Sequence, residues 1–206
     1  MAKNHQFRPR RSMLYVPGCN RRYLEKAKSL NVDSVILDLG DPILIDAKEL
    51  SRDNVVDFLN QDCYGKREVV VRVNDFDSPW GLDDIKAVAH LNPDAILFPN
   101  VESREHVERA INELDKAGGQ DVPIMVMIES PIAVLHAEEI ASASDRIQCM
   151  ILATSDLISQ LHARGTQSRV AILHSLSTVI LAARAYGHAV VDGIHSNLKD
   201  TESFEY

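Results

Sequence analysis

Hydrophobic positions along this chain fall into short uninterrupted runs that alternate with longer stretches of helical spacing. Because the apolar residues of each run stand at consecutive rather than alternate positions, the runs predict strands that are buried on both faces. Seven such strands are expected, over residues 12–18, 34–39, 68–74, 94–100, 123–130, 149–155 and 189–195. Between them, apolar residues recur at i, i+3 and i+4 and predict helices with a core-facing stripe. Examples are Val107, Ala110, Ile111 and Leu114, and then Ile172, Leu173, Leu176, Val179, Ile180 and Ala183.

Strands of this kind alternating with helices predict an α/β fold in which helices cover a parallel sheet. Either a βα barrel or an open, doubly wound sheet would satisfy the alternation. Nearly every run carries polar or special residues at its C-terminal end, namely Gly18 and Asn20, Asp38 and Asp41, Arg72 and Asn74, Asn100, Glu129, Ser155 and Asp156, and Asp192 and His195. A closed barrel brings all such ends to one face, whereas an open sheet gathers ligands near one switch point. The pattern favours a (β/α)8 TIM-type barrel, although any single polar residue could equally mark the entry to a loop.

The length of the chain limits how much of that barrel it can hold. The 206 residues contain no low-complexity linker, so we expect one TIM-barrel domain over residues 1–206. A complete barrel typically takes about 250 residues. About seven βα units can be counted, and an eighth strand with its helix is not found. The expected barrel is therefore incomplete at its C-terminal end, or is completed in some other way.

Charge and cysteine content narrow the class of protein. A formal net charge of -8 argues against nucleic acid binding. The basic residues Arg8, Arg10, Arg11, Arg21 and Arg22 cluster near the N-terminus and could together receive an anionic ligand. Three widely spaced cysteines without a CxxC motif indicate neither a disulfide framework nor a zinc site. There is no apolar leader and no run of ~18 apolar residues, so we expect a cytoplasmic protein that does not bind membranes.

Several motifs follow one another along the chain, most of them at the expected strand ends. They are R-R-S-M-L-Y-V-P-G-C-N-R-R, V-I-L-D-L-G-D, V-V-V-R-V-N, F-P-N-V-E-S, M-I-E-S-P, T-S-D-L and L-A-A-R-A-Y-G. Together they resemble the citrate lyase beta subunit family, a relative of malyl-CoA lyases within the HpcH/HpaI aldolase group, from about Arg10 to Asp200. The resemblance implies a TIM barrel, commonly a homotrimer, that makes or breaks a carbon–carbon bond between an acyl thioester and a 2-oxo acid. It also implies Mg²⁺, or Mn²⁺, as cofactor.

Two carboxylates at strand ends are the residues expected to bind a metal ion. The resemblance matches Glu129, ending the fifth expected strand, and Asp156, just after the sixth, to the family's magnesium ligands, with Glu129 also bordering the substrate. Two hard carboxylates that leave the remaining coordination positions to water and substrate suit Mg²⁺. Without the resemblance, either residue could be a solvated loop group, and Asp156 before L-I-S-Q could be a helix N-cap.

Arg72 ends the apolar strand V-V-V-R, where an unpaired guanidinium would be costly to bury. It therefore needs an anion. One candidate is a carboxylate of a neighbouring strand, in a structural ion pair. The other, implied by the resemblance, is the carboxylate or carbonyl oxygen of the substrate, held bidentately. Asp38 and Asp41 match the acidic residues of the family pattern Asp-Leu-Glu-Asp, so the expected catalytic residues are Arg72, Asp38 and Asp41.

The loop P-G-C-N-R-R is the expected place for part of the coenzyme A moiety of a thioester substrate. Gly18 would let the backbone approach a ligand, and Arg22 matches the family's arginine in this loop. An ordinary loop would explain the same residues. A beta subunit of a full citrate lyase would in addition need an acyl-carrier partner.

Gly40 and Asn100 depart from the family pattern, which has glutamate at the first position and usually lysine at the second. Two functions remain open. The first is a magnesium-dependent lyase acting on a hydroxyacyl thioester of the citryl-, malyl- or citramalyl-CoA type, supported by the presence of Arg72, Glu129 and Asp156. The second is a noncatalytic protein that binds CoA or a CoA thioester and has lost turnover, supported by Gly40 and Asn100.

Overall fold

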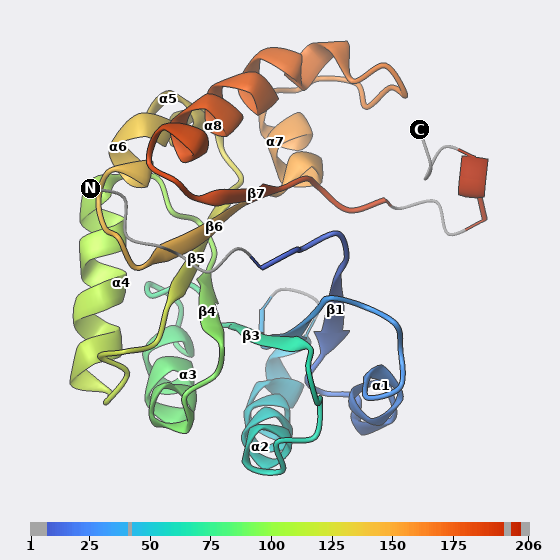
Figure 1. Ribbon diagram of the computed structural model, residues 1–206, viewed down its shortest axis with the longest axis vertical. Coiled ribbons are helices and arrows are strands. Elements are labelled where there is room, and N and C mark those ends of the chain that lie inside the picture. The colour runs from blue at the N-terminus through green and yellow to red at the C-terminus, as the bar shows by residue number, and fades with distance from the viewer. Residues whose placement is uncertain (1–7, 41–42, 196–198, 203–206) are drawn as a thin grey trace. The chain divides into compact units, whose positions relative to one another are not determined.

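The computed structural model describes residues 8–40, 43–195 and 199–202 (Figure 1). The chain divides into two compact units. The first comprises Met1–Pro99 and Glu108–Met125, and the second comprises Asn100–Val107 and Val126–Tyr206. Each unit combines strands with helices, as expected for an α/β fold.

Four parallel strands form the sheet of the first unit. They are β1 (Met13–Pro17), β2 (Ser34–Asp38), β3 (Glu68–Arg72) and β4 (Ala95–Phe98). Each strand pairs in parallel with the next, and the register sets Pro17 opposite Asp38 and Asp38 opposite Arg72. The C-terminal ends of β1, β2 and β3 therefore lie at one edge, and the side chains that end these strands are close neighbours.

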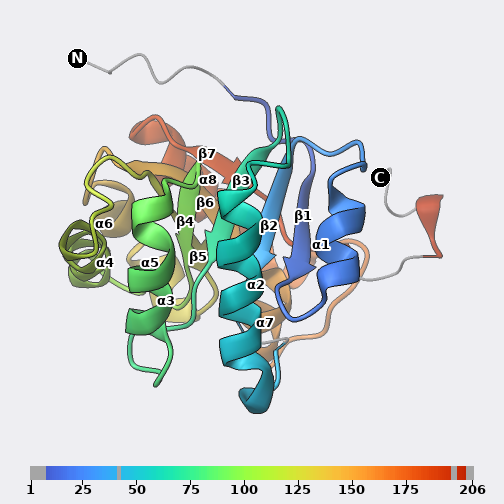
Figure 2. The ribbon, with the colours of Figure 1, turned by 90° about the horizontal axis from the view of Figure 1, so that it is seen from below.

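Helices cover one face of these strands. The helices α1 (Arg21–Ala27), α2 (Lys48–Asn60) and α3 (Gly81–Val88) lie side by side there (Figure 2), together with the short 3-10 helices η1 (Ile45–Ala47) and η2 (Ala89–Leu91). Asn20 caps α1, because its side chain accepts a hydrogen bond from the amide of Tyr23. The helix α4 (Arg104–Lys116) buries Val107, Ala110 and Leu114, which confirms the stripe expected from the sequence except at the partly exposed Ile111.

The second unit contains β6 (Ile147–Leu152) and β7 (Ala189–Val191), which pair in parallel. Its helices are α5 (Pro131–Leu135), α6 (Ala137–Ala141), α7 (Thr154–Gln160), the 3-10 helix η3 (Val170–Ile172) and α8 (Leu173–Ala185). The long α8 packs on α5, α6, β6 and β7. Leu176, Val179 and Ala183 of its expected stripe are buried, whereas Leu173 and Ile180 are exposed.

Strand β5 (Ile124–Ile128) contributes to both units, since the division falls between its second and third residues. The hydrogen-bonded order of the seven strands follows the chain, from β1 to β7. All seven expected strands are confirmed, although each ends at least one residue earlier than expected. Two of them, β2 and β3, end on the polar residues Asp38 and Arg72. The α/β fold is thereby confirmed. The described residues hold no eighth strand, so a closed eight-stranded barrel is not confirmed.

The N-terminal arginines are engaged by carboxylates at the opposite, N-terminal ends of the strands. Arg8 donates to Asp94, Arg10 to Glu68 and Arg11 to Asp33, at distances of 2.6 to 3.0 Å. These partners stand at or just before the first residues of β4, β3 and β2. Arg21 pairs separately with Asp57. The arginines therefore tie strand starts together instead of forming one anion site.

Across residues 8–40, 43–195 and 199–202, no helix has the length and apolar character needed to cross a membrane. The cysteines Cys19, Cys63 and Cys149 are free thiols.

Candidate functional site

A buried ion pair between Asp38 and Arg72 joins the ends of β2 and β3. Arg72 Nε donates to Asp38 Oδ1 at 2.7 Å, and Arg72 Nη2 donates to Asp38 Oδ2 at 2.9 Å. The Arg72 and Asp38 side chains are only 9% and 1% exposed. The guanidinium also lies over the ring of Tyr15, 5.3 Å from its centroid. The neighbouring-strand carboxylate, one of the two anions expected for Arg72, is therefore present, and the contact of Arg72 with substrate stays a prediction.

Gly40 lies directly against this ion pair. Its amide donates to Asp38 Oδ1 at 2.8 Å. A Cβ added at Gly40 would lie 3.0 Å from Arg72 Nε and 3.1 Å from Arg72 Cζ and Nη2, which is tighter than ordinary van der Waals contact. Because Asp38 already holds the guanidinium through both oxygens, a side chain at residue 40 would have to displace Arg72. The position that departs from the family's glutamate is thus the one on which Arg72 packs.

For Gly18 and Arg22, which are also expected near this edge, the described part of the structure gives no contact that indicates a ligand. Asp41 lies outside the described residues. Gly18 donates its amide to the Asp38 carbonyl at 2.9 Å, and a Cβ at Gly18 would lie 2.9 Å from Val55 Cγ2. Close packing against α2 therefore accounts for this glycine without a ligand. Arg22 is exposed near the start of α1. The roles of Gly18 and Arg22 toward coenzyme A stay predictions.

In the second unit, Glu129 directly follows β5 and is 6% exposed. Its Oε1 accepts a hydrogen bond from the amide of Asn100 at 3.1 Å. Asn100 has a φ of 52°, a left-handed conformation that asparagine adopts more readily than most residues. The next residue, Ser130, caps α5 and donates to Glu102 Oε1 at 2.6 Å. The carboxylate of Glu129 is therefore held near the end of its strand by a backbone amide of a neighbouring loop.

Asp156 is exposed and lies in the first turn of α7. The N-cap of this helix is Ala153, so the alternative that Asp156 is the N-cap is wrong. The amide of Ala153 donates to the carbonyl of Ile128 at 3.1 Å, so the residues just before Glu129 and just before α7 are hydrogen-bonded to each other. A carboxylate in a first turn also complements the helix dipole, which is a structural reason for an acid at residue 156.

The two residues expected to bind a metal, Glu129 and Asp156, both offer carboxylate oxygens. In the part of the chain that the structure describes, no group of three or more histidine, cysteine, aspartate and glutamate side chains could hold a metal ion. Mg²⁺ is commonly bound by one or two carboxylates, with water and substrate completing its coordination. Glu129 and Asp156 fit that requirement, and they follow Ile128 and Ala153, whose backbones are hydrogen-bonded to each other. Their role as ligands stays a prediction.

The sequence analysis missed a buried polar cluster beside Gly40, formed by Lys48, Asn74 and Asp84. Each of the three side chains is 6% exposed or less. Lys48 donates a hydrogen bond to Asn74, and Asn74 donates one to Asp84. One sign of the cluster is the place of Lys48 at the start of α2, where the helix dipole opposes a positive charge. Such a lysine needs specific acceptors.

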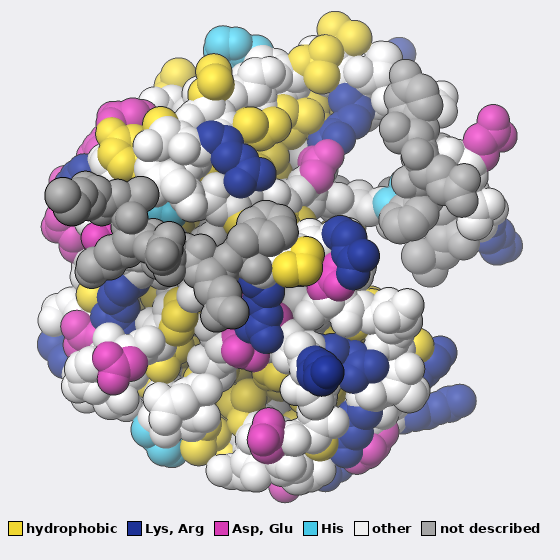
Figure 3. Space-filling model, viewed as in Figure 1, with side chains coloured by type: hydrophobic (Ala, Val, Ile, Leu, Met, Phe, Trp, Pro, Cys, Tyr) yellow, Lys and Arg dark blue, Asp and Glu magenta, His cyan; other side chains and the backbone are white. Residues whose placement is uncertain are grey.

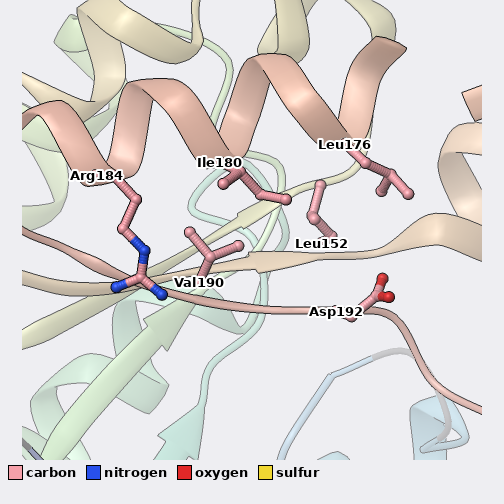
Figure 4. Close-up of a pocket in the computed structure, with 6 residues that line it drawn as sticks. All are labelled: Leu152, Leu176, Ile180, Arg184, Val190 and Asp192. Carbon is pink, nitrogen blue, oxygen red and sulfur yellow. The ribbon is translucent and has the colours of Figure 1, made fainter. Parts of the chain in front are cut away.

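A separate hollow in the second unit lies between α8 and the strands β6 and β7 (Figure 4). It has a volume of about 190 Å³ and is lined by Leu152, Leu176, Ile180, Arg184, Val190 and Asp192. Figure 3 shows hydrophobic side chains reaching the surface in this region. Asp192 is held by two hydrogen bonds from Arg169, at 2.5 and 2.7 Å, which lower the pKa of its carboxyl. The ion pair with Arg169 accounts for this strand-end acid, and neither Glu129 nor Asp156 lines the hollow.

The sequence of this chain matches one protein family over nearly its whole length. Residues 11–205 match the HpcH/HpaI aldolase/citrate lyase family. The chain belongs to this family. The resemblance inferred from the strand-end motifs is thereby confirmed, and with it the assignment to an enzyme family.

One similar curated enzyme and two similar solved structures illustrate the match. A (3S)-malyl-CoA thioesterase of Cereibacter sphaeroides is 39% identical over 198 residues, which cover 96% of this chain and 67% of that enzyme. The citrate lyase beta subunit of Mycobacterium tuberculosis, complexed with oxaloacetate and magnesium, has a TM-score of 0.77 and 25% identity, covering 94% of this chain and 82% of that chain. The CitE protein of the same organism, in complex with magnesium, acetoacetate and coenzyme A, has a TM-score of 0.76 and 26% identity, covering 94% and 68% of the two chains.

Proposed function

We propose that this protein is a magnesium-dependent carbon–carbon lyase. Its substrate would be a hydroxyacyl thioester of the citryl-, malyl- or citramalyl-CoA type, and its products an acyl thioester and a 2-oxo acid. The observation that carries the proposal is the buried Asp38–Arg72 pair, which holds a guanidinium at the C-terminal edge of the first unit's strands. The oxaloacetate and magnesium bound by the M. tuberculosis beta subunit, and the thioester named for the C. sphaeroides enzyme, support it.

Arg72 would bind an anionic oxygen of the substrate. Cleavage of the carbon–carbon bond expels an enolate, so positive charge near the oxygens that become anionic lowers the barrier. Asp38 orients the guanidinium from one side, so little side-chain freedom is left to lose when an oxygen binds. Asp38 thereby serves as a positioning residue for Arg72. Asp41 is proposed as a further catalytic acid of this edge on the resemblance alone.

Glu129 and Asp156 would hold the Mg²⁺ ion, with Glu129 also bordering the substrate. The ion, when bound, supplies a Lewis acid for the substrate's oxygens. Burial and the Asn100 amide restrict the Glu129 carboxylate before any ligand arrives. Gly18 and Arg22 are proposed to contact the coenzyme A moiety.

A noncatalytic CoA-thioester-binding protein is the second candidate, and one observation favours it. Arg72 packs on Gly40, where the family pattern has a glutamate, so this edge lacks one carboxylate of that pattern. Binding of an anion would survive such a change more readily than proton transfer would.

The wider architecture is also proposed from the resemblance. We propose one TIM-barrel domain, which assembles into a homotrimer. A beta subunit of a full citrate lyase would in addition work with an acyl-carrier partner. Free thiols at Cys19, Cys63 and Cys149 are consistent with a reducing compartment, for which we propose the cytoplasm.

The deciding experiment follows the products formed from malyl-CoA in the presence of Mg²⁺. A lyase releases acetyl-CoA and glyoxylate, a thioesterase releases malate and free CoA, and a binding protein releases neither. We expect acetyl-CoA and glyoxylate to form in equal amounts, and neither product to form once a chelator has removed the Mg²⁺. Citryl-CoA and citramalyl-CoA are tested in parallel. Binding of these thioesters without any product would establish the noncatalytic alternative.

A second experiment uses the variant Arg72→Lys, which keeps the positive charge but loses the two parallel N–H donors of the guanidinium. We expect it to weaken oxaloacetate binding by about 1 to 3 kcal/mol, the range for a hydrogen bond to a charged group. Arg109→Lys, at an exposed ion pair with Asp77, is the control. Equal oxaloacetate affinity in Arg72→Lys and the parent would leave Arg72 with a structural role only.

A further inference from the structure

Lys48 is the first residue of α2, and its ammonium is buried beside the turn that follows β2. Nζ donates to the carbonyl of Leu39 at 3.0 Å, to the carbonyl of Gly40 at 2.7 Å and to Asn74 Oδ1 at 2.6 Å. An ammonium has three N–H donors, and three acceptors among the described residues lie within hydrogen-bond distance of this one. Since burial removes the water that would otherwise solvate the charge, these contacts stabilise Lys48 in its buried position.

A second layer of hydrogen bonds fixes the acceptor on Asn74. Asn74 Nδ2 donates to the carbonyl of Leu39 at 2.7 Å and to Asp84 Oδ2 at 2.6 Å. Asp84 Oδ2 also accepts from the Asn74 amide at 3.0 Å, and Asp84 Oδ1 accepts from Arg52 Nε at 2.8 Å. With its nitrogen so engaged, the Asn74 side chain must turn its oxygen toward Lys48. The ammonium is therefore anchored to α3 and to the loop after β3.

The turn held by Lys48 is also the turn that contacts the Asp38–Arg72 pair. The Gly40 amide donates to Asp38 Oδ1 at 2.8 Å, and the Leu39 amide donates to the Arg72 carbonyl at 2.9 Å. A Cβ at Gly40 would lie 3.0 to 3.1 Å from the guanidinium, so Arg72 would have to shift to admit it. Leu39 and Gly40 are therefore hydrogen-bonded to Lys48 through their carbonyls. Through their amides, Gly40 is bonded to the Asp38 carboxylate and Leu39 to the backbone carbonyl of Arg72, so a displacement of the turn is transmitted to both residues.

We propose that Lys48 is a positioning residue, which fixes the Leu39–Gly40 turn so that Asp38 and Arg72 keep the fork geometry needed to bind an anionic substrate oxygen. The identity of that anion rests on the proposed function, whereas the hold of Lys48 on the turn does not. Functional groups need support from surrounding hydrogen bonds to stay in productive geometry, and a buried network of this kind can provide it.

The test compares Lys48→Gln and Lys48→Met with the control Lys86→Gln, which removes an exposed lysine of α3. Two quantities are measured in each protein, the hydrogen exchange of the Leu39 and Gly40 amides and the affinity for oxaloacetate. We expect both Lys48 variants to exchange the two amides at least about tenfold faster and to bind oxaloacetate at least about tenfold more weakly, a factor worth 1.4 kcal/mol. Lys86→Gln should match the parent in both.

A stability control separates positioning from general destabilisation. Val179→Ala creates a cavity in α8 of the second unit and should lower the melting temperature while keeping the parent's oxaloacetate affinity. If Lys48→Gln behaves like Val179→Ala, with lower stability and unchanged affinity, the positioning role is overturned. Should Lys48→Met not fold, Lys48→Gln carries the comparison. Emission from Trp80, the single tryptophan, whose ring centroid lies 5.3 Å from Lys48 Nζ, reports the local environment in each folded variant.

Failure of the proposed function gives a different result. A folded parent that binds no oxaloacetate refutes the assignment of the anion, and the exchange measurement then decides on Lys48 by itself. Faster exchange at Leu39 and Gly40 in the Lys48 variants supports the hold on the turn. Unchanged exchange overturns the inference whatever the ligand proves to be.

Discussion

Arg72 and Asp38 share two hydrogen bonds across neighbouring parallel strands, with both side chains buried. Each charge depends on the other, because removing one partner leaves the second buried without its ion-pair partner. We therefore expect Arg72→Met to lower the free energy of unfolding by about 3 to 5 kcal/mol, the cost of breaking a buried pair. Urea unfolding at neutral pH measures this change.

The double variant Arg72→Met with Asp38→Leu supplies the control for that prediction. Removing both charges avoids the unpaired ion, so the double variant should lose less stability than the sum of the two single variants. Additive losses would mean that the two groups are not coupled in solution.

Gly40 should resist even the smallest side chain. An added Cβ would sit 3.0 to 3.1 Å from the guanidinium of Arg72, which Asp38 holds in place. We expect Gly40→Ala to destabilise the protein by about 1 to 3 kcal/mol, as overpacking of a well-packed site does. Thermal unfolding gives the comparison.

The matched substitution for Gly40→Ala is Gly165→Ala, where the nearest atom to an added Cβ is Ile158 Cδ1 at 3.8 Å. That change should be neutral or stabilising by up to about 1 kcal/mol. If both variants unfold like the parent, Arg72 can move away from Gly40 at little cost, and Gly40→Glu then becomes a direct test for restored turnover of malyl-CoA.

Metal binding should depend on Glu129 and Asp156 together. Because each would supply one of two anionic ligands, Glu129→Gln or Asp156→Asn should abolish the heat of Mg²⁺ binding in calorimetry. Asp145→Asn, an exposed acid of the same unit, should bind Mg²⁺ as the parent does. Unaltered Mg²⁺ affinity in both Glu129→Gln and Asp156→Asn would rule out these ligands.

The Arg11–Asp33 pair predicts a pH dependence of stability. Hydrogen bonds from Arg11 lower the pKa of Asp33 from its ordinary 3.8 to about 2. A carboxyl with a depressed folded pKa stabilises the protein above its unfolded pKa, and this stabilisation is lost as pH falls toward the folded pKa. The difference in melting temperature between the parent and Asp33→Asn should therefore be full above about pH 5 and shrink between about pH 4 and pH 2.

Asp121→Asn serves as the control for that titration, since Asp121 is exposed and makes no ion pair among the described residues. Its melting temperature should follow that of the parent across the whole range. A gap between the parent and Asp33→Asn that persists unchanged at pH 2 would contradict the assignment to Arg11.

The strands could be predicted because each is a continuous apolar run, a property of neighbouring residues alone. Their C-terminal ends were predicted too far along the chain, because the predicted ranges include polar residues such as Asn74 and Ser155, which lie beyond the last strand residue in the structure. The register of β2 and β3 was not available from the pattern, and with it the pairing of Asp38 with Arg72 was left as one of two possibilities.

The polar cluster around Lys48 could not be found by reading strand ends. Its members come from the start of α2, the loop after β3 and the interior of α3, which only tertiary packing brings together. The sequence showed that Gly40 departs from the family pattern, but the contact of Gly40 with Arg72 depends on the path of the Arg72 side chain. Likewise, the exposure of Leu173 and Ile180 on α8 does not follow from their spacing, because the same stripe in α4 is buried at Val107 and Leu114.

The pairing of Arg8, Arg10 and Arg11 with successive strand starts has a consequence for biosynthesis. Their carboxylate partners lie 86, 58 and 22 residues further along the chain. As the ribosome releases the polypeptide, Arg11 can therefore meet Asp33 first, Arg10 then meets Glu68, and Arg8 meets Asp94 last. Closing the longest of these loops costs only about 1 kcal/mol more than closing the shortest. The order in which the three pairs form is therefore set by the order of synthesis and not by loop-closure entropy. The N-terminal segment can complete its contacts only after the start of β4 has been synthesised.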